Sequence, residues 1–312
     1  MRVASLLVII PALALAWPCV AQDATSITTK DTVESVTVSG TRERQVIDKF
    51  VKSLAAPAHL SGKISRWEDG VCPITVGLRP TATKFISDRL RQVAADVGAP
   101  TGRPDCTPNI EIVFTTTPQA LMDTVRKERP QLLGFAYTGG QMDALAKVTH
   151  SIQAWYTTQT RDLRGNVTMD VGRHSGPGIE VPCNCDAGIM LQLPDANAVS
   201  VTGSRLGDGT RSDFYHVIVV ADPTKLSDYS IGAIADAVAL LALSHVDAPE
   251  SCQPLASIAN LLVPGCTQVP DGLSANDLAF LRGLYGRMNP ARAPSVQQGQ
   301  IASQIERDTA GR

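Results

Sequence analysis

Aromatic side chains are scarce in this sequence, where Phe, Trp and Tyr together make up only 4% of the 312 residues. Hydrophobic residues as a whole make up 44%, so a chain of this length can still bury a large core. That core must consist mainly of Val, Leu, Ile and Ala. An excess of charge of one sign is also lacking, because 28 Lys and Arg residues face 30 Asp and Glu residues. This balance gives no electrostatic reason to expect nucleic acid or an anionic membrane as a partner.

Long apolar runs are missing from the chain except at its start. Residues Leu6 to Trp17 form an apolar core that is too short for a stable membrane span. Arg2 precedes it, and Cys19-Val20-Ala21 follows as a small-x-small cleavage pattern. We therefore expect a signal peptide at 1–21, and a periplasmic or secreted protein without stable membrane insertion. An uncleaved N-terminal anchor is the alternative that the length of the run disfavours.

Several catalytic motifs are absent as well. The sequence has no G-x-S-x-G nucleophile elbow and no glycine-rich phosphate loop of the Walker or dinucleotide type. Trp155 and Tyr156 offer a candidate groove for an extended peptide, whereas the alternative interpretation places them in a core strand. The sequence predicts no cofactor.

Cysteine is present in an even number once the signal peptide with Cys19 is removed. Six cysteines in an exported chain predict three disulfides, although fifteen pairings are formally open. His174 lies near the closely spaced Cys-x-Cys pair, which could instead bind a soft metal or exchange thiols. In an oxidising compartment a structural disulfide is the favoured role. The pairings that we favour are Cys72–Cys106, Cys252–Cys266 and Cys183–Cys185.

Periodicity predicts an α+β fold with a mixed sheet. Phe85, Ile86, Leu90, Val93 and Val97 recur at helical spacing, and we expect them on one buried face. We expect strands at 33–42 (an edge strand), 72–78, 110–114, 152–158 and 215–221. We expect further helices at 231–245, 275–285 and 296–305, and one that ends at 54. Thr117 should cap the start of one more helix. We divide the chain into a signal peptide (1–21), a lead-in segment with a short helix (22–58), one main domain (59–290) and a polar tail helix (291–312).

The C-terminal half carries the most specific pattern. Leu273-Ser-Ala-Asn-Asp-Leu-Ala-Phe-Leu-Arg-Gly-Leu-Tyr-Gly286 resembles the last helix of the metzincin-type zinc metalloproteases. Ser257-Ile258-Ala259 stands where that family has a Ser-Ile-Met turn, and Trp67 to Phe114 resembles its opening strand, helix and strand. Ser274 should cap the last helix, with Asp277 at its third position. The resemblance implies a protease-like domain; exported bacterial proteins of unknown function also share this layout.

The metal-binding pattern of that family, H-E-x-x-H-x-x-G-x-x-H, is degenerate here. Aligned with it, Ala235 and Ala239 occupy the first two histidine positions, Asp236 the glutamate position and His245 the third histidine position. A zinc site needs at least three protein ligands, and a methyl group cannot ligate. The resemblance therefore implies a retained fold without zinc chemistry. Apart from the resemblance, we expect His245 to interact with the C-terminus of the helix. We expect Asp236 to lie on the solvent-exposed edge of the helix, because burying an unpaired carboxylate is costly.

Three functions remain open for such a chain. The first is an exported, non-catalytic protease-like protein that binds a peptide or an envelope protein through an exposed strand edge. The second is a hydrolase with an unorthodox metal site, for example His174, His216 and His245 converging in space. The third is a structural subunit of an envelope assembly, which a large exposed apolar patch would indicate.

Overall fold

The computed structural model describes residues 29–170, 178–181, 189–192, 208–247 and 249–310. The predicted signal peptide, His174 and the Cys183–Cys185 pair lie outside this part. The chain forms two compact units, Met1–Gly40 and Thr41–Arg312, and the fold described below is that of the second. Within the described residues, no helix has the length and apolar character needed to cross a membrane.

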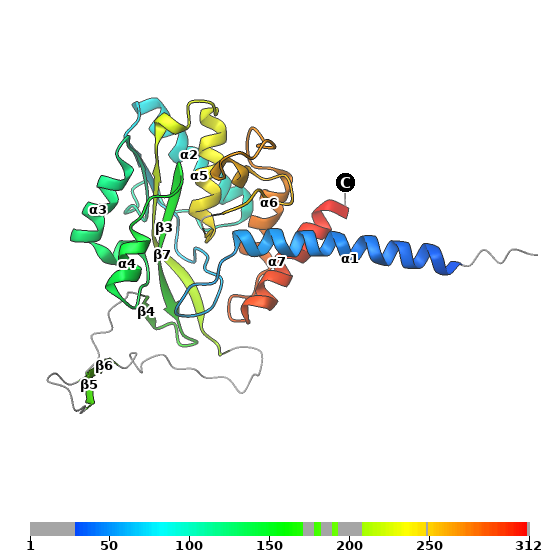
Figure 1. Ribbon diagram of the computed structural model, residues 1–312, viewed down its shortest axis with the longest axis horizontal. Helices are drawn as coiled ribbons and strands as arrows, with labels where there is room; N and C mark the ends of the chain where they lie inside the picture. Colours follow the sequence, from blue (N-terminus) through cyan, green and yellow to red (C-terminus); the bar gives the residue numbers. More distant parts are fainter. Residues whose placement is uncertain (1–28, 171–177, 182–188, 193–207, 248, 311–312) are drawn as a thin grey trace, which may run out of the picture. The chain divides into compact units, whose positions relative to one another are not determined.

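A mixed five-stranded sheet organises the second unit, with strand order β1-β2-β7-β3-β4 (Figure 1). β1 (Pro73–Val76), β2 (Ile110–Phe114) and β7 (Arg211–Ala221) run parallel. β3 (Ile152–Arg161) pairs antiparallel with β7, and β4 (Val167–Met169) pairs antiparallel with the last residues of β3. The short strands β5 (Gly178–Val181) and β6 (Ile189–Gln192) form a separate antiparallel pair. The expected α+β class with a mixed sheet is confirmed.

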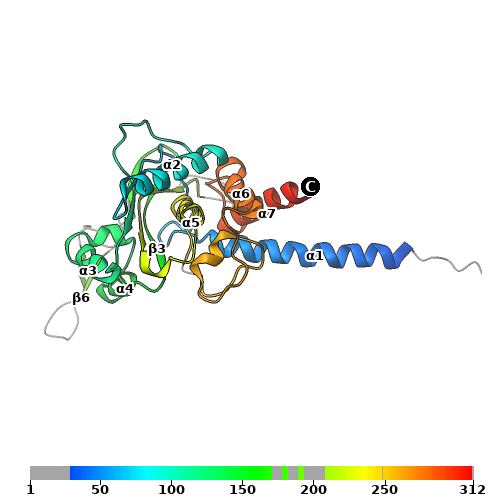
Figure 2. The same cartoon turned by 90° about the horizontal axis from the view of Figure 1, so that it is seen from above.

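Helices cover both faces of this sheet (Figure 2). One face carries the larger core, which includes Val217 and Val219 of β7 and the buried residues of five helices. The other face carries a smaller core, which includes Ile218 and Val220. This alternation follows from the two-residue period of a strand. The helices of the first face are the second-unit part of α1 (Thr29–Leu54), α2 (Pro80–Val97), α5 (Ile231–Leu243), α6 (Ala275–Arg282) and α7 (Pro294–Ala310). Those of the second face are α3 (Pro118–Glu128), α4 (Gly139–Leu145) and the 3-10 helix Pro130–Leu133.

Most expected elements are present, and three local expectations are wrong. The predicted edge strand at 33–42 is instead part of α1, whose amphipathic second half ends at Leu54. Because extending an existing helix costs less than starting a new one, the amphipathic half favours a helical conformation in the residues before it. Phe85 is 44% exposed, although its neighbour Ile86 is fully buried. Thr117 precedes α3, but its side chain makes no capping hydrogen bond.

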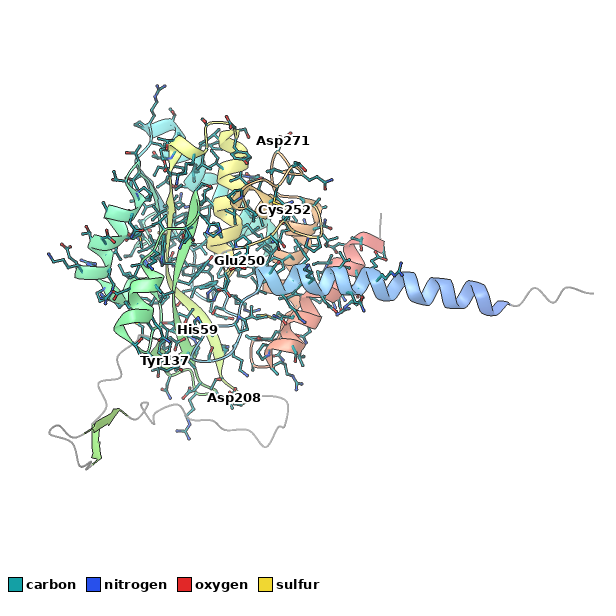
Figure 3. The ribbon with its side chains drawn as sticks, in the orientation of Figure 1. His59, Tyr137, Asp208, Glu250, Cys252 and Asp271 are labelled. Carbon is teal, nitrogen blue, oxygen red and sulfur yellow. A yellow bond between two sulfur atoms is a disulfide. The ribbon has the colours of Figure 1, made fainter. Side chains whose placement is uncertain are left out.

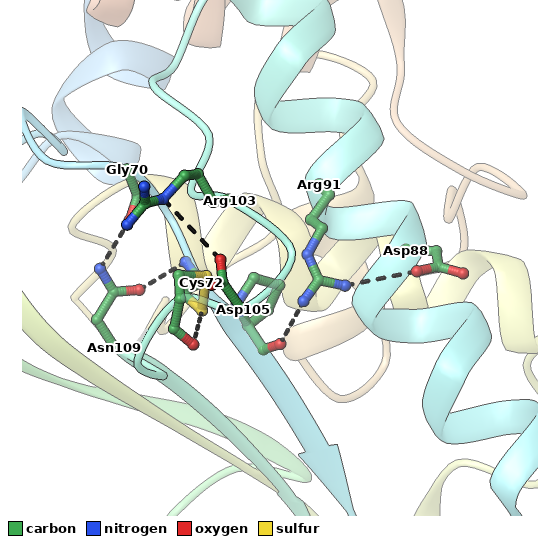
Figure 4. Close-up of a disulfide and its surroundings, with 9 residues drawn as sticks. Gly70, Cys72, Asp88, Arg91, Arg103, Asp105 and Asn109 are labelled. Atoms are coloured by element: carbon green, nitrogen blue, oxygen red, sulfur yellow. Dashed lines mark hydrogen bonds and ion pairs between the residues drawn. A yellow bond between two sulfur atoms is a disulfide. The ribbon is translucent and has the colours of Figure 1, made fainter.

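Both predicted disulfides within the described residues are present. Cys72–Cys106 joins the start of β1 to the loop before β2 (Figure 4). Beside it, the side chain of Asn109 accepts from the Cys72 amide at 2.7 Å and donates to the Gly70 carbonyl at 3.1 Å. Cys252–Cys266 closes a loop between α5 and α6. Two disulfides are typical of a protein that folds in an oxidising compartment.

The C-terminal helix belongs to the main core. Ile301 and Ile305 of α7 are fully buried there, as is the polar side chain of Gln297. The Gln297 amide accepts from the Ile64 backbone N–H at 2.9 Å and donates to the Pro290 carbonyl at 2.9 Å. Because its polar groups are satisfied, Gln297 can be buried at little cost.

Candidate functional site

The C-terminal end of α5 is closed by side chains from several elements. The last four carbonyls of a helix have no partner within the helix, and each of them here accepts a side-chain hydrogen bond. Ser244 donates to the carbonyl of Leu240 at 2.7 Å. The other donors are the Tyr156 hydroxyl to Leu241 (3.1 Å), the Trp67 indole to Ala242 (2.8 Å) and the Tyr285 hydroxyl to Leu243 (2.7 Å). Three of the few aromatic polar groups thus fix where the chain leaves α5.

Tyr156 also holds the residues that follow this helix end. Its hydroxyl accepts from the Val246 amide at 3.3 Å, and burial raises its pKa. The ring of His245 lies against the Tyr156 ring, with centroids 4.4 Å apart. The His245 backbone carbonyl accepts from the Ala56 amide at 2.9 Å. His245 therefore sits at a position set by β3, by the end of α5 and by the segment after α1.

Burial keeps the His245 imidazole neutral. Its side chain is 13% exposed, and burial lowers its pKa to about 4, a shift that nearby Asp247 opposes and His59 reinforces. The Nε2 atom lies 4.0 Å from a carboxylate oxygen of Asp247. The Nδ1 atom is buried, and no described residue forms a hydrogen bond with it. The expectation that His245 lies at the helix C-terminus is confirmed in position, but its charged form is disfavoured.

A cavity of about 230 Å³ opens beside His245 and Tyr156. Its lining combines aliphatic and aromatic groups with three of the five histidines of the chain. Cavities that hold drug-sized ligands measure about 300–1,000 Å³, so this one is suited to one or two side chains. The histidines are His59, His150 and His245, and the charged lining residues are Lys147 and Asp247.

A second cavity of about 330 Å³ adjoins the first. The two share His59, Phe135, Ala144 and Leu145 in their linings. Tyr137 borders the second cavity and is 69% exposed (Figure 3). The two cavities are therefore neighbours, with His59 between them.

The edge of β3 that faces away from β7 runs along the first cavity. Hydrogen-bonded residues alternate in an antiparallel pair, and the Asp222 amide donates to the Ser151 carbonyl at 2.9 Å. Gln153 and Trp155 therefore turn their backbone groups toward β7, whereas Ile152 and Ala154 turn theirs to the outer edge. Within the part of the chain that the structure describes, no strand pairs with Ile152–Ala154 on this edge.

The same edge is closed at its other end. β4 pairs with β3 only from Gln159 to Arg161, and the Thr158 carbonyl accepts from the Asp170 amide at 2.9 Å. Gly134, with φ of 100°, covers the carbonyl of Tyr156, because a Cβ at Gly134 would lie 2.7 Å from that oxygen. Only glycine adopts such a backbone and permits this approach without strain. The open edge therefore extends from Ile152 to about Tyr156.

The residues at the degenerate metal-site positions in α5 take part in core packing and in an ion pair. Ala235 and Ala239 are fully buried in the main core. Asp236 is 4% exposed and forms a bidentate ion pair with Arg89 of α2 at 2.6 and 3.1 Å. It also accepts from the Leu273 amide at 2.8 Å. The expectation that Asp236 lies at a wet helix edge is wrong, because Arg89 supplies the counter-charge that makes its burial tolerable.

The suggested convergence of His174, His216 and His245 is not supported by the described residues. His216 lies two residues from Ile218 on β7, so its side chain is on the sheet face of the smaller core, where it meets Glu111 at 3.4 Å. His245 packs against Tyr156 and Phe214 on the opposite face. In the described ranges, no three His, Cys, Asp or Glu side chains are arranged to hold a metal ion.

The turn that resembles the Ser-Ile-Met turn is attached to α6. Ser274 and Asp277 form the predicted capping box at the start of that helix. The Asp277 carboxylate also accepts from the Ser257 hydroxyl and from the Ile258 amide, the latter at 2.9 Å. Burial raises the pKa of Asp277, while these donors oppose the shift. Asp277 is therefore a structural link between two segments of the resemblance.

Sequence reasoning identified part of this site. Trp155 and Tyr156 both line the first cavity, although both are also core residues of β3. The sequence does not predict that His59, Lys147 and His150 line the same cavity. Each of them lies on a loop, and their spacing does not show that these loops meet. Against family models, curated proteins and solved structures alike the chain finds no match, so the site is interpreted from its own residues.

Proposed function

We propose that this protein is an exported, non-catalytic, protease-like binding protein that captures an extended peptide segment along the outer edge of β3. One observation carries the proposal: the backbone groups of Ile152 and Ala154 that face away from β7 pair with no other described residue, and they border a cavity lined by Tyr156 and His245. A strand added to an exposed sheet edge gains main-chain hydrogen bonds, and adjacent pockets select its side chains.

The unpaired edge has an energetic consequence. Free N–H and C=O groups on a strand edge invite pairing with another chain, and proteins usually cover or shorten such edges. Each backbone hydrogen bond that a peptide forms there contributes about 0.5–1.5 kcal/mol net. Ile152 and Ala154 offer two N–H and two C=O groups, so main-chain pairing can contribute several kcal/mol before the side chains are counted.

The state of His245 supports a binding role for the cavity. A buried polar atom without a hydrogen-bond partner is unusual in a folded protein. Within the described part of the chain, Nδ1 of His245 is such an atom, in a residue that lines the cavity. Because this nitrogen is buried, a polar group of a bound segment can pair with it only after the His245 ring turns toward the cavity; such a pair would offset the cost of leaving the nitrogen unsatisfied.

The residues aligned with the catalytic positions of the protease pattern fit a binding role. Ala235 and Ala239 contribute packing to the core, and Asp236 joins α5 to α2 through Arg89. Both arrangements stabilise the domain. We propose that the chain keeps a protease-like layout and that its peptide-binding edge is the part in use.

The test uses the full mature chain and an array of capped random heptapeptides, with the affinity of the strongest measured by calorimetry. Ala154→Pro removes one N–H that points away from β7, so it should weaken binding about tenfold or more and leave the β3–β7 pairing in place. Ala154→Val is the matched control, because it changes the side chain and keeps the N–H.

Two results count against the proposal. The first is an array on which no peptide binds the folded wild-type chain. The second is equal affinity of a peptide for the wild-type and Ala154→Pro chains, since this would place the peptide away from the β3 edge. N-methylation of alternate peptide amides gives an independent measurement, because strand addition requires that only one set of alternate amides is sensitive.

A further inference from the structure

Two opposite charges line the cavity beside β3. Lys147 and Asp247 are both exposed, and both border this space. Asp247 lies 4.0 Å from Nε2 of His245. For the ammonium group of Lys147, none of the described carboxylates is within ion-pair distance, so it is free to interact with a ligand.

The two charges come from opposite sides of the sheet. His245, which is next to Asp247, packs against Tyr156 on the face that α5 covers. The Lys147 carbonyl accepts from the side chain of Gln153 at 3.0 Å. Gln153 alternates with Tyr156 along β3, so its side chain is on the opposite face with Trp155. A strand paired with the edge of β3 therefore lies between an acidic and a basic side of the cavity.

Successive side chains of an added strand point to these two sides in turn. Both sides are covered by apolar groups, with Leu241 and Leu262 on one and Leu133 and Leu145 on the other. A strand that is buried on both faces carries apolar residues at consecutive positions. A charged ligand residue fits here only where it meets a complementary charge. Lys147 is positively charged, so an acidic side chain fits beside it.

We infer that the segment captured at β3 is a run of apolar residues that carries one acidic side chain facing Lys147. The inference rests on the proposed peptide-binding function and specifies its ligand. Among the lining residues, Leu133, Gly134 and Thr158 are buried, whereas Lys147 and Thr149, like His59 and Asp247, are exposed, so the cavity is closed beside the Tyr156 end of the edge and open elsewhere, including beside Lys147. The bound chain continues outward there, and the carboxylate belongs to a side chain and not to a chain terminus.

The test compares hexapeptides of Val and Leu, capped at both ends, that carry either Glu or Gln at each internal position in turn. With the wild-type chain, Glu at one position should bind about three- to fivefold more tightly than Gln, the gain expected of a solvent-accessible ion pair. K147Q should abolish this preference, so that the Glu and Gln peptides bind the variant with equal affinity. K127Q, which removes an exposed lysine of α3 outside the cavity, should keep the preference, and so should D247N.

The outcomes separate this inference from the function on which it rests. If Glu and Gln peptides bind equally well and the binding is lost in A154P, strand capture stands and the acidic preference is wrong. If an uncapped Gln peptide binds as tightly as the capped Glu peptide, the carboxylate comes from a chain terminus and the inference is overturned. If no peptide of either kind binds, the proposed function itself fails.

Discussion

The ring of His245 packs against the ring of Tyr156 with 4.4 Å between centroids, while Nδ1 of the imidazole finds no hydrogen-bond partner among the described residues. Tyr156 comes from β3, and His245 follows α5. The contact therefore joins the open strand edge to the end of the most buried helix. Both residues line one cavity, and the predictions below follow from how this region is held and from what it leaves unpaired.

The first prediction concerns the pH dependence of stability. Burial lowers the pKa of His245 from 6.5 to about 4. Between these values the unfolded chain binds a proton that the folded protein does not bind, so the free energy of unfolding falls as the pH drops from 6.5 toward 4. The loss from this residue should total roughly 3 kcal/mol, measured by denaturant unfolding at a series of pH values.

His245→Phe provides the control for this prediction. It keeps an aromatic ring against Tyr156 and removes both nitrogens, so the wild-type chain should lose more stability between pH 6.5 and 4 than the variant does. At pH 7.5 the variant should be as stable as wild type, or more stable by up to about 1 kcal/mol, because a buried unsatisfied nitrogen is gone. Parallel stability curves for the two proteins would show that His245 is not held neutral by the fold.

The second prediction concerns the end of α5. Tyr285→Phe removes the hydroxyl that donates to the Leu243 carbonyl at 2.7 Å. The buried carbonyl then lacks a partner, which should lower the free energy of unfolding by about 1–3 kcal/mol. Tyr229→Phe is the matched control, because Tyr229 is half-buried and none of the hydrogen bonds described here involves its hydroxyl; its effect should stay within about 0.5 kcal/mol.

The third prediction assigns a structural role to Asp236. Asp236→Ala removes the partner of the Arg89 guanidinium and the acceptor of the Leu273 amide. Because Arg89 is 30% exposed and can recover some hydration, the expected loss of stability is about 2–3 kcal/mol, below the full cost of breaking a buried pair. Asp88→Ala removes a carboxylate from surface ion pairs of α2 and should have almost no effect. An Asp236→Ala protein as stable as wild type would contradict this role.

The fourth prediction concerns the disulfide Cys252–Cys266, whose cysteines are 14 residues apart. Replacing both cysteines by serine should lower the free energy of unfolding by about 3 kcal/mol, mainly through the larger entropy of the unfolded chain. Reducing agent should destabilise the wild-type protein by more than it destabilises a variant that lacks both described disulfides. A double variant with unchanged stability in oxidising buffer would show that the loop is already ordered in the unfolded state or not constrained by the bond.

The sequence predicts the regular elements well, because their burial follows their periodicity. β2 alternates buried and half-buried residues from Ile110 to Phe114, and α2 ends at Gly98, which has φ of 81°. The capping box of Ser274 and Asp277 was also predictable, since it depends on residues three apart. Local patterns report local contacts, and these expectations required no knowledge of the tertiary structure.

The candidate site could be predicted only in part, because it depends on contacts between distant segments. Asp236 was expected near water, and only the position of Arg89, 147 residues earlier, explains its burial. His59 and His150 line one cavity because two loops meet beside β3. The open edge of β3 depends on which strand pairs with which, and a single sequence does not encode that in its spacing.

Backbone hydrogen exchange at β3 tests the account most directly. In the free protein the Ala154 amide should exchange much faster than the Gln153 and Trp155 amides, because these two donate to β7 and Ala154 faces the cavity. A bound peptide should then slow exchange at Ala154 and leave Gln153 and Trp155 unchanged. An Ala154 amide that is already as protected as its neighbours in the free chain would mean that the edge is covered, and strand capture would be excluded.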